Sequence, residues 1–98
     1  MTDQTTRLME TVTICNQRGL HARASAKFVG AVAKLPASVE VIVAKDGNDA
    51  AGGSILGLMM LGAAKGDTID IAVSGPNGEA APALAKLAGL VKDGFGED

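Results

Sequence analysis

The sequence contains few aromatic residues, and this scarcity excludes some classes of protein. Phe28 and Phe95 are the whole aromatic content of the 98 residues, with no tryptophan and no tyrosine. A surface on which nucleobases stack needs more rings than this. The net charge of −2 also lacks the basic excess of a nucleic-acid-binding domain. We therefore expect no nucleic-acid partner.

Cysteine, histidine and long apolar runs are scarce as well. A single cysteine, Cys15, and a single histidine, His21, exclude an internal disulfide framework and argue against a metal site. The longest nearly unbroken apolar run, residues 55–64, is about half as long as a membrane span. The first ten residues are polar and contain no hydrophobic signal segment. We therefore expect a cytoplasmic protein with no cofactor, no metal and no membrane contact.

The charges are distributed unevenly along the chain. Residues 1–34 contain five basic and two acidic side chains, a net charge of +3. Residues 35–98 contain four lysines and nine acids, a net charge of −5. His21 lies in the basic part, so we expect an anionic ligand or an acidic partner surface to approach that side of the molecule.

Hydrophobic periodicity predicts one domain over residues 1–98. Alternating apolar and β-branched residues predict strands at residues 9–15, 39–45, 48–53 and 68–73. Helical spacing predicts helices at residues 22–35, 55–61 and 79–91. The order β-α-β-β-α-β-α predicts an α+β, two-layer open-faced sandwich, with a four-stranded antiparallel sheet covered on one face by helices. Residues 1–8 and 93–98 are expected to fray.

His21 is the residue best suited to carry chemistry, because it precedes the first predicted helix. The first backbone N–H groups of a helix have no internal partners, and the helix dipole is positive there. A neutral imidazole at this place can act as a nucleophile, and a phosphoryl group on a ring nitrogen would face free N–H donors. Arg23 could fold back and pair with the phosphate oxygens. The alternative is that His21 only caps the helix on the surface.

Two segments resemble a known family. Residues 16–26, NQRGLHARASA, are similar to the active-site segment of HPr, the histidine-containing phosphocarrier of the phosphoenolpyruvate-dependent phosphotransferase system, whose pattern is N-x-x-G-L-H-A-R-P-A. Residues 54–59, SILGLM, are similar to the second family segment, a serine followed by I-L/M-G-L-M. The resemblance covers residues 9–91. It implies a phosphoryl-group carrier in a relay rather than a stand-alone enzyme.

The resemblance assigns roles to the residues around His21. It implies that His21 accepts a phosphoryl group from Enzyme I on Nδ1 and passes it to Enzyme IIA-type acceptor proteins. Arg23 matches the arginine that supports the phosphohistidine, and Asn16 matches the polar residue that shapes the active-site loop. Ala24 stands where the family usually has proline. This departure favours a nitrogen-regulatory branch over sugar transport, and both branches stay open.

Ser54 has two interpretations. From the residues alone it is the N-cap of the predicted short helix. The resemblance adds regulatory phosphorylation by an HPr kinase/phosphorylase, which would bring negative charge to the docking face. Gly53 stands where relatives often carry a basic residue, and this departure weakens the regulatory interpretation.

The helix after Ser54 is too apolar for an ordinary surface helix. Part of it must pack in the core, yet seven residues of one helix cannot all point inward. The resemblance implies that some of them form an adaptable apolar patch, for which methionine is well suited. The expected partner-binding residues are Ala22, Lys27, Ile55, Leu56 and Met59.

Three other expectations complete the sequence-based hypotheses. Cys15 is expected to be a small buried hydrophobic residue. A carrier that presents one face to several partners is expected to be a monomer. The rival functions are a regulatory interaction module that acts through the apolar patch without phosphotransfer, and a domain that binds a small ligand in an apolar pocket. The presence of His21 and Arg23 argues against the first, and the lack of rings argues against the second.

Overall fold

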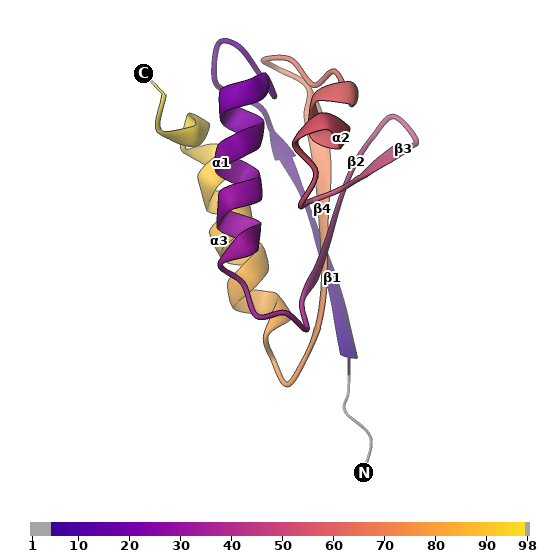
Figure 1. Ribbon diagram of the computed structural model, residues 1–98. Coiled ribbons are helices and arrows are strands. Elements are labelled where there is room, and N and C mark those ends of the chain that lie inside the picture. The colour runs from indigo at the N-terminus through magenta and orange to yellow at the C-terminus, as the bar shows by residue number, and fades with distance from the viewer. Residues whose placement is uncertain (1–4, 98) are drawn as a thin grey trace.

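One antiparallel sheet organises the chain. In the computed structural model, which describes residues 5–97, the strands are β1 (Thr5–Thr13), β2 (Glu40–Lys45), β3 (Asn48–Ala51) and β4 (Thr68–Pro76), in the spatial order β1-β4-β2-β3. The helices are α1 (Ala22–Ala33), α2 (Ile55–Met60) and α3 (Ala80–Lys92), followed by a 3₁₀ turn, η1 (Gly94–Gly96). Figure 1 shows α1 and α3 packed together on one face of the sheet. The predicted α+β open-faced sandwich and its element order are confirmed.

The core lies between the sheet and these helices. Ile69, Ile71 and Val73 alternate along β4 and are buried, because successive side chains of a strand point to opposite faces. Phe28 of α1 and Leu87 of α3 are buried against the same side. One apolar stripe per helix and one apolar face of the sheet therefore form a single core.

The hairpin between β2 and β3 turns where the sequence predicts it. Asp46 and Gly47 have φ of 52° and 82°, and Lys45 pairs with Asn48. Positive φ at both central residues is the geometry of a two-residue turn that matches strand twist, for which Asp-Gly is a preferred sequence. The hairpin prediction is confirmed.

The ends of the chain are more ordered than the sequence suggests. Strand β1 begins at Thr5, which pairs with Pro76 at the end of β4, so the expected fraying of residues 5–8 is wrong. At the other end Phe95 is buried, and η1 follows α3 directly, so the expected fraying of residues 93–97 is also wrong. The remainder of that prediction concerns residues 1–4 and 98, which lie outside the described residues.

Cys15 is exposed, which corrects its predicted burial. The alternation of β1 continues past its last residue and places Ile14 and Asn16 inside. Cys15 between them therefore points outward, where its Sγ lies 3.4 Å from the backbone oxygen of Lys92. Within residues 5–97, no helix is long and apolar enough to cross a membrane.

Candidate functional site

The loop between β1 and α1 is held in a left-handed turn at Gly19. Gly19 has φ of 63°, a conformation that costs little only for glycine. A Cβ atom at this position would lie 2.3 Å from the backbone oxygen of Ala63. The next residue, Leu20, donates its backbone N–H to that same oxygen at 2.9 Å. The loop is thus fixed against the segment that follows α2, and His21 is presented at the start of α1.

His21 is the N-cap of α1, as the sequence predicts. Its backbone is extended, with φ of −74° and ψ of −179°, and its Nδ1 accepts a hydrogen bond from the backbone N–H of Arg23 at 3.3 Å. Its Nε2 lies 2.9 Å from Oε2 of Glu97. A carboxylate only accepts and a backbone N–H only donates, so we assign the proton of the neutral ring to Nε2. The lone pair of Nδ1 then faces the N-terminus of the helix.

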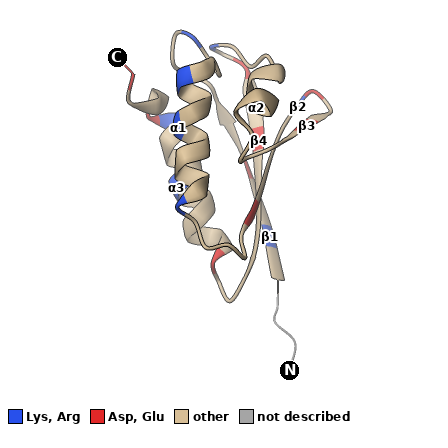
Figure 2. Cartoon of the chain, in the orientation of Figure 1, with Lys and Arg blue, Asp and Glu red and all other residues tan. Residues whose placement is uncertain are grey.

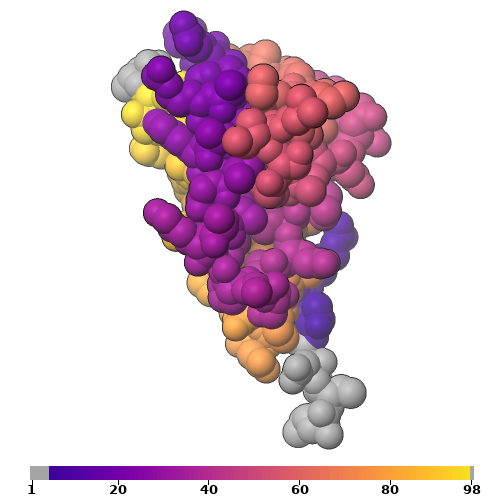
Figure 3. All heavy atoms as spheres, viewed as in Figure 1, coloured from indigo at the N-terminus to yellow at the C-terminus, as the bar shows by residue number. Residues whose placement is uncertain are grey.

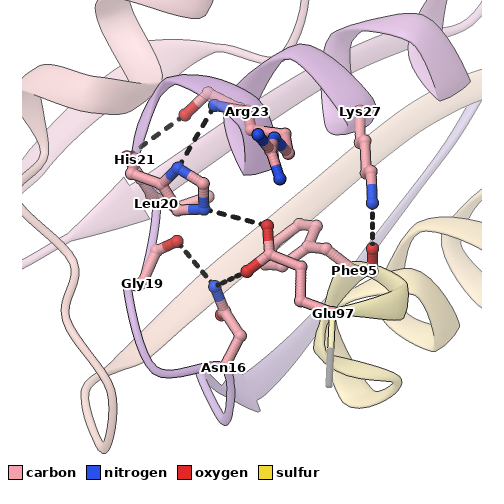
Figure 4. Close-up of polar contacts among 9 residues, drawn as sticks. Asn16, Gly19, Leu20, His21, Arg23, Lys27, Phe95 and Glu97 are labelled. Atoms are coloured by element: carbon pink, nitrogen blue, oxygen red, sulfur yellow. Dashed lines mark hydrogen bonds and ion pairs between the residues drawn. The ribbon is translucent and has the colours of Figure 1, made fainter.

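Asn16 connects the loop to the end of the chain. Its side-chain amide is buried and donates to the backbone oxygen of Gly19 at 2.9 Å and to Oε1 of Glu97 at 3.1 Å. Both hydrogens of the amide are therefore used. Its Oδ1 atom is buried and has no partner among the described residues. Asn16 holds the loop and the Glu97 carboxylate at once, as Figure 4 shows.

The C-terminal segment is tied down at two points, and we call residues 94–97 the C-terminal hook. The Phe95 side chain is only 1% exposed and packs in the core. The Lys27 amine donates to the backbone oxygen of Phe95 at 2.8 Å. Gly94 and Gly96 on either side have positive φ, which lets the chain reverse sharply around the ring. The hook thereby brings Glu97 to His21 across 76 positions of sequence.

Glu97 is ionised more readily than an ordinary glutamate. Its partial burial by itself would raise the pKa of the carboxyl. The hydrogen bonds from Asn16 and His21, together with the positive charge of Lys27, outweigh this effect and lower the pKa below its usual value. The group that faces Nε2 is therefore a carboxylate at neutral pH.

An open cleft of about 450 Å³ lies over His21 and the hook. Its charged lining residues other than Glu97 are basic, and Figure 2 shows lysine and arginine in the loop before α1 and along α1. Arg23 projects its guanidinium over this cleft in Figure 4. Such a lining attracts an anion to the ring. The residues around the cleft are Gln17, Arg18, His21, Arg23, Lys27, Gly96 and Glu97.

Helix α2 presents apolar side chains beside α1. Leu58 is fully buried, whereas Leu56 is 68% and Met60 77% exposed, and Ile55 and Met59 are also exposed. The space-filling view in Figure 3 shows the α2 segment next to the first turns of α1 on one face. Ser54 caps the helix, because its Oγ accepts from the backbone N–H of Gly57 at 3.0 Å. The predicted cap is confirmed, and so is the expectation that this helix cannot be wholly core.

The comparison with protein families agrees with the two sequence motifs. Residues 8–93 match the family described as PTS HPr component phosphorylation site, where PTS is the phosphotransferase system. The chain belongs to the HPr family of phosphocarrier proteins. Membership implies partners from the phosphotransferase system, Enzyme I and the IIA-type proteins.

Relatives from both branches of the family are similar to this chain. Phosphocarrier protein HPr of Neisseria meningitidis serogroup B is 41% identical over 90 residues, which cover 92% of this chain and 97% of that protein. Phosphocarrier protein NPr of Escherichia coli K12 is 38% identical over 90 residues, which cover 91% and 96%. The crystal structure of HPr-C-His from Thermoanaerobacter tengcongensis has a TM-score of 0.78 and 33% identity, and the match covers 93% of this chain and 98% of that chain.

Within this HPr-family fold, the structure brings together most of the residues that the sequence singles out. His21, Arg23 and Lys27 line one cleft, and Asn16 lies beneath it. Ala22 is exposed in the first turn of α1. Ile55, Leu56 and Met59 form a separate surface on α2 rather than part of the cleft lining.

Sequence reasoning missed Phe95 and Glu97. The only signal was an aromatic residue between two glycines in an otherwise polar tail. No short motif links Glu97 to His21, because their contact depends on where α3 ends in space.

Proposed function

We propose that His21 is the phosphoryl-carrying residue of this HPr-family protein. It receives the phosphoryl group from Enzyme I and passes it to a IIA-type acceptor. The observation that carries this proposal is the Nδ1 lone pair, which faces the backbone N–H of Arg23 at 3.3 Å in a basic cleft. A nucleophile in this place has amide donors of the helix N-terminus beside it.

The transfer proceeds by in-line displacement between two histidines. The Nδ1 lone pair forms the new N–P bond while the bond from phosphorus to the donor's ring nitrogen breaks, and the donor nitrogen keeps that electron pair. The N–H of Arg23 can then donate to a phosphoryl oxygen instead of Nδ1. The Arg23 guanidinium balances the charge of the phosphoryl group. Transfer to the acceptor is the same step in reverse.

The exposed position of the site suits transfer across a protein interface. The partner must place its own histidine in line with Nδ1, so an open cleft is required rather than an enclosed pocket. We propose that partners dock on the face formed by α1 and α2, through Ala22, Lys27, Ile55, Leu56 and Met59. The basic side chains steer acidic partners toward this face. Asn16 supports the site indirectly, because it fixes the loop that carries His21.

Ser54 supports a second, regulatory proposal. Its Oγ lies at the N-terminus of α2, directly before the exposed apolar residues of the docking face. A phosphate there would add about −1.5 to −2 charges without removing an interaction of the core. Docking that buries those apolar side chains would then become costly. An HPr kinase/phosphorylase would be the partner for this modification.

The test is phosphorylation with phosphoenolpyruvate and Enzyme I, followed by measurement of the intact mass. We expect one added phosphoryl group that is lost on brief acid treatment, because phosphohistidine is acid-labile, and no gain in His21→Ala. Enzyme I of the sugar branch and of the nitrogen branch are tested in parallel, and the faster reaction assigns the branch. No gain with either active enzyme would contradict the proposal and leave the α2 surface as a regulatory binding site.

A further inference from the structure

We propose that Glu97 is a positioning residue for phosphoryl transfer. Its carboxylate accepts the Nε2–H of His21 and thereby keeps Nδ1 unprotonated, with its lone pair directed at the N-terminus of α1. The inference rests on the proposed role of His21. It extends beyond the family match, which ends at residue 93, whereas the C-terminal hook comprises residues 94–97.

The contacts of the ring determine which nitrogen is free. Nε2 lies 2.9 Å from Oε2 of Glu97, and Nδ1 lies 3.3 Å from the backbone nitrogen of Arg23. If the proton moved to Nδ1, it would face an N–H donor, and Nε2 would face a carboxylate with no proton between them. Both contacts would then be repulsive. The carboxylate therefore selects the tautomer in which Nδ1 is the nucleophile.

The hook is built to hold this carboxylate in place. Phe95 anchors it in the core, and Lys27 binds its backbone. Asn16 uses its second amide hydrogen on Oε1 of Glu97 while its own Oδ1 stays buried without a partner among the described residues. Oε1 of Glu97 is thus held by Asn16 at 3.1 Å while Oε2 faces His21 at 2.9 Å, so both oxygens of the carboxylate are positioned. The Glu97 side chain is only 15% exposed.

The carboxylate also fits the charge balance of the transfer. When Nδ1 forms the N–P bond, the ring still carries its Nε2 proton and becomes positively charged. The charge spreads to Nε2–H, which donates to Glu97. No proton has to leave during the step, and the carboxylate stabilises the charged ring. A carboxylate behind a catalytic histidine has the same two effects in hydrolases, where it fixes the tautomer and stabilises the imidazolium.

The experiment compares Glu97→Ala with the wild type in the rate of transfer from phosphorylated Enzyme I. Loss of the hydrogen-bond partner behind a metal-ligating histidine typically costs about 10–100-fold, and we take the lower end of that range for this metal-free imidazole. We expect the kcat of transfer from Enzyme I to fall by about that factor, while the KM of Enzyme I for this protein stays unchanged. Glu79→Ala is the matched control, because it removes the same charge far from His21, beside Ser38, and should transfer at the wild-type rate.

The ring itself gives a second readout that a purely structural role would not change. In the ¹⁵N-labelled, unphosphorylated protein at mildly alkaline pH, we expect widely separated shifts for a protonated Nε2 and a bare Nδ1. In Glu97→Ala both tautomers become populated, and the two shifts move toward each other. Glu97→Gln keeps an acceptor oxygen and should restore much of the separation. A Gln variant that matches the Ala variant contradicts the proposed hydrogen bond.

Other outcomes also overturn the proposal. An unchanged kcat in Glu97→Ala, a raised kcat, or a change confined to KM would show that Glu97 is neutral, inhibitory or a docking residue. Failure of the wild type to accept any phosphoryl group would instead contradict the proposed function. The ring shifts still decide the tautomer in that case, because they need no phosphoryl donor.

Discussion

The backbone oxygen of Ala63 lies where a side chain of Gly19 would have to begin, at 2.3 Å from the position of its Cβ. The same oxygen accepts the N–H of Leu20 at 2.9 Å. Gly19 belongs to the family segment around His21, residues 16–26, and Ala63 follows α2, which begins after Ser54. This contact therefore holds the loop that carries His21 against the segment that follows α2. It also explains why the reactive loop can be rigid although it lies at the surface.

Gly19→Ala is expected to damage both stability and phosphoryl transfer. The residue has φ of 63°, and strain in the left-handed region costs about 1–2 kcal/mol for alanine. The new methyl group must also displace the Ala63 segment, which adds to that cost. We expect the free energy of unfolding to fall by at least about 2 kcal/mol, as measured in urea, and the rate of phosphorylation of His21 to fall with it.

Gly30→Ala is the matched control for that substitution. Gly30 lies inside α1 with ordinary helical geometry, and nothing lies within 4 Å of its missing Cβ. Replacing a helical glycine with alanine stabilises by about 0.5–1 kcal/mol. We expect a more stable protein that is phosphorylated normally. Equal stability of the two variants would show that the Ala63 contact does not constrain the loop.

Substitutions of Ser54 separate its helix-capping role from the effect of a negative charge at this position. Ser54→Ala removes the hydrogen bond to the backbone N–H of Gly57 and should cost about 1 kcal/mol of stability. Ser54→Asp retains a good N-cap but adds a negative charge beside the docking face. We expect Ser54→Ala to be less stable yet phosphorylated at the normal rate, and Ser54→Asp to be stable yet slower with Enzyme I. Phosphorylation of Ser54→Asp by Enzyme I at the wild-type rate would limit Ser54 to a structural role.

Phe95→Ala tests whether the hook is part of the folded core. Phe95 is fully buried, and truncation of a buried phenylalanine typically costs about 3–5 kcal/mol. We expect a loss in this range, measured by urea unfolding. Met60→Ala, at an exposed site, is the control and should change stability by less than about 0.5 kcal/mol. A small effect of Phe95→Ala would mean that the hook is only loosely attached.

The sequence predicted the order of strands and helices along the chain because each element carries its own pattern. Residues 68–73 alternate, residues 22–35 have helical spacing, and Asp-Gly marks the hairpin. The first residues of the edge strand β1 carry no such pattern. Residues 5–8 are strand because β4 continues as far as Pro76, opposite Thr5, and offers hydrogen-bond partners, not because of their own apolar periodicity. Long-range pairing of this kind cannot be read from a local window.

The residues of the candidate site also divide into those that the local sequence predicts and those whose position depends on long-range packing. His21 and Ser54 were predictable, because each precedes a helix and its capping role follows from local geometry. Glu97 was not predictable, because its contact with His21 depends on the length of α3 and on the burial of Phe95. The exposure of Cys15 follows from continuing the β1 alternation by two residues, so a stricter use of period two would have found it.

The lowered pKa of Glu97 predicts how the hook responds to acid. In the unfolded chain this carboxyl titrates near its ordinary value of 4.5, and in the folded protein its pKa lies lower. A group with a lowered pKa in the folded state stabilises fully above its unfolded pKa, and this contribution is lost as the pH falls through the folded value. Glu97→Gln lacks the titrating group. We expect the wild type to exceed this variant in unfolding free energy above about pH 4.5. Below that pH the difference should shrink, as measured by urea unfolding at successive pH values. A difference that grew as the pH fell below about 4.5 would mean that the pKa is raised, and that the contacts with Asn16 and His21 do not hold the carboxylate.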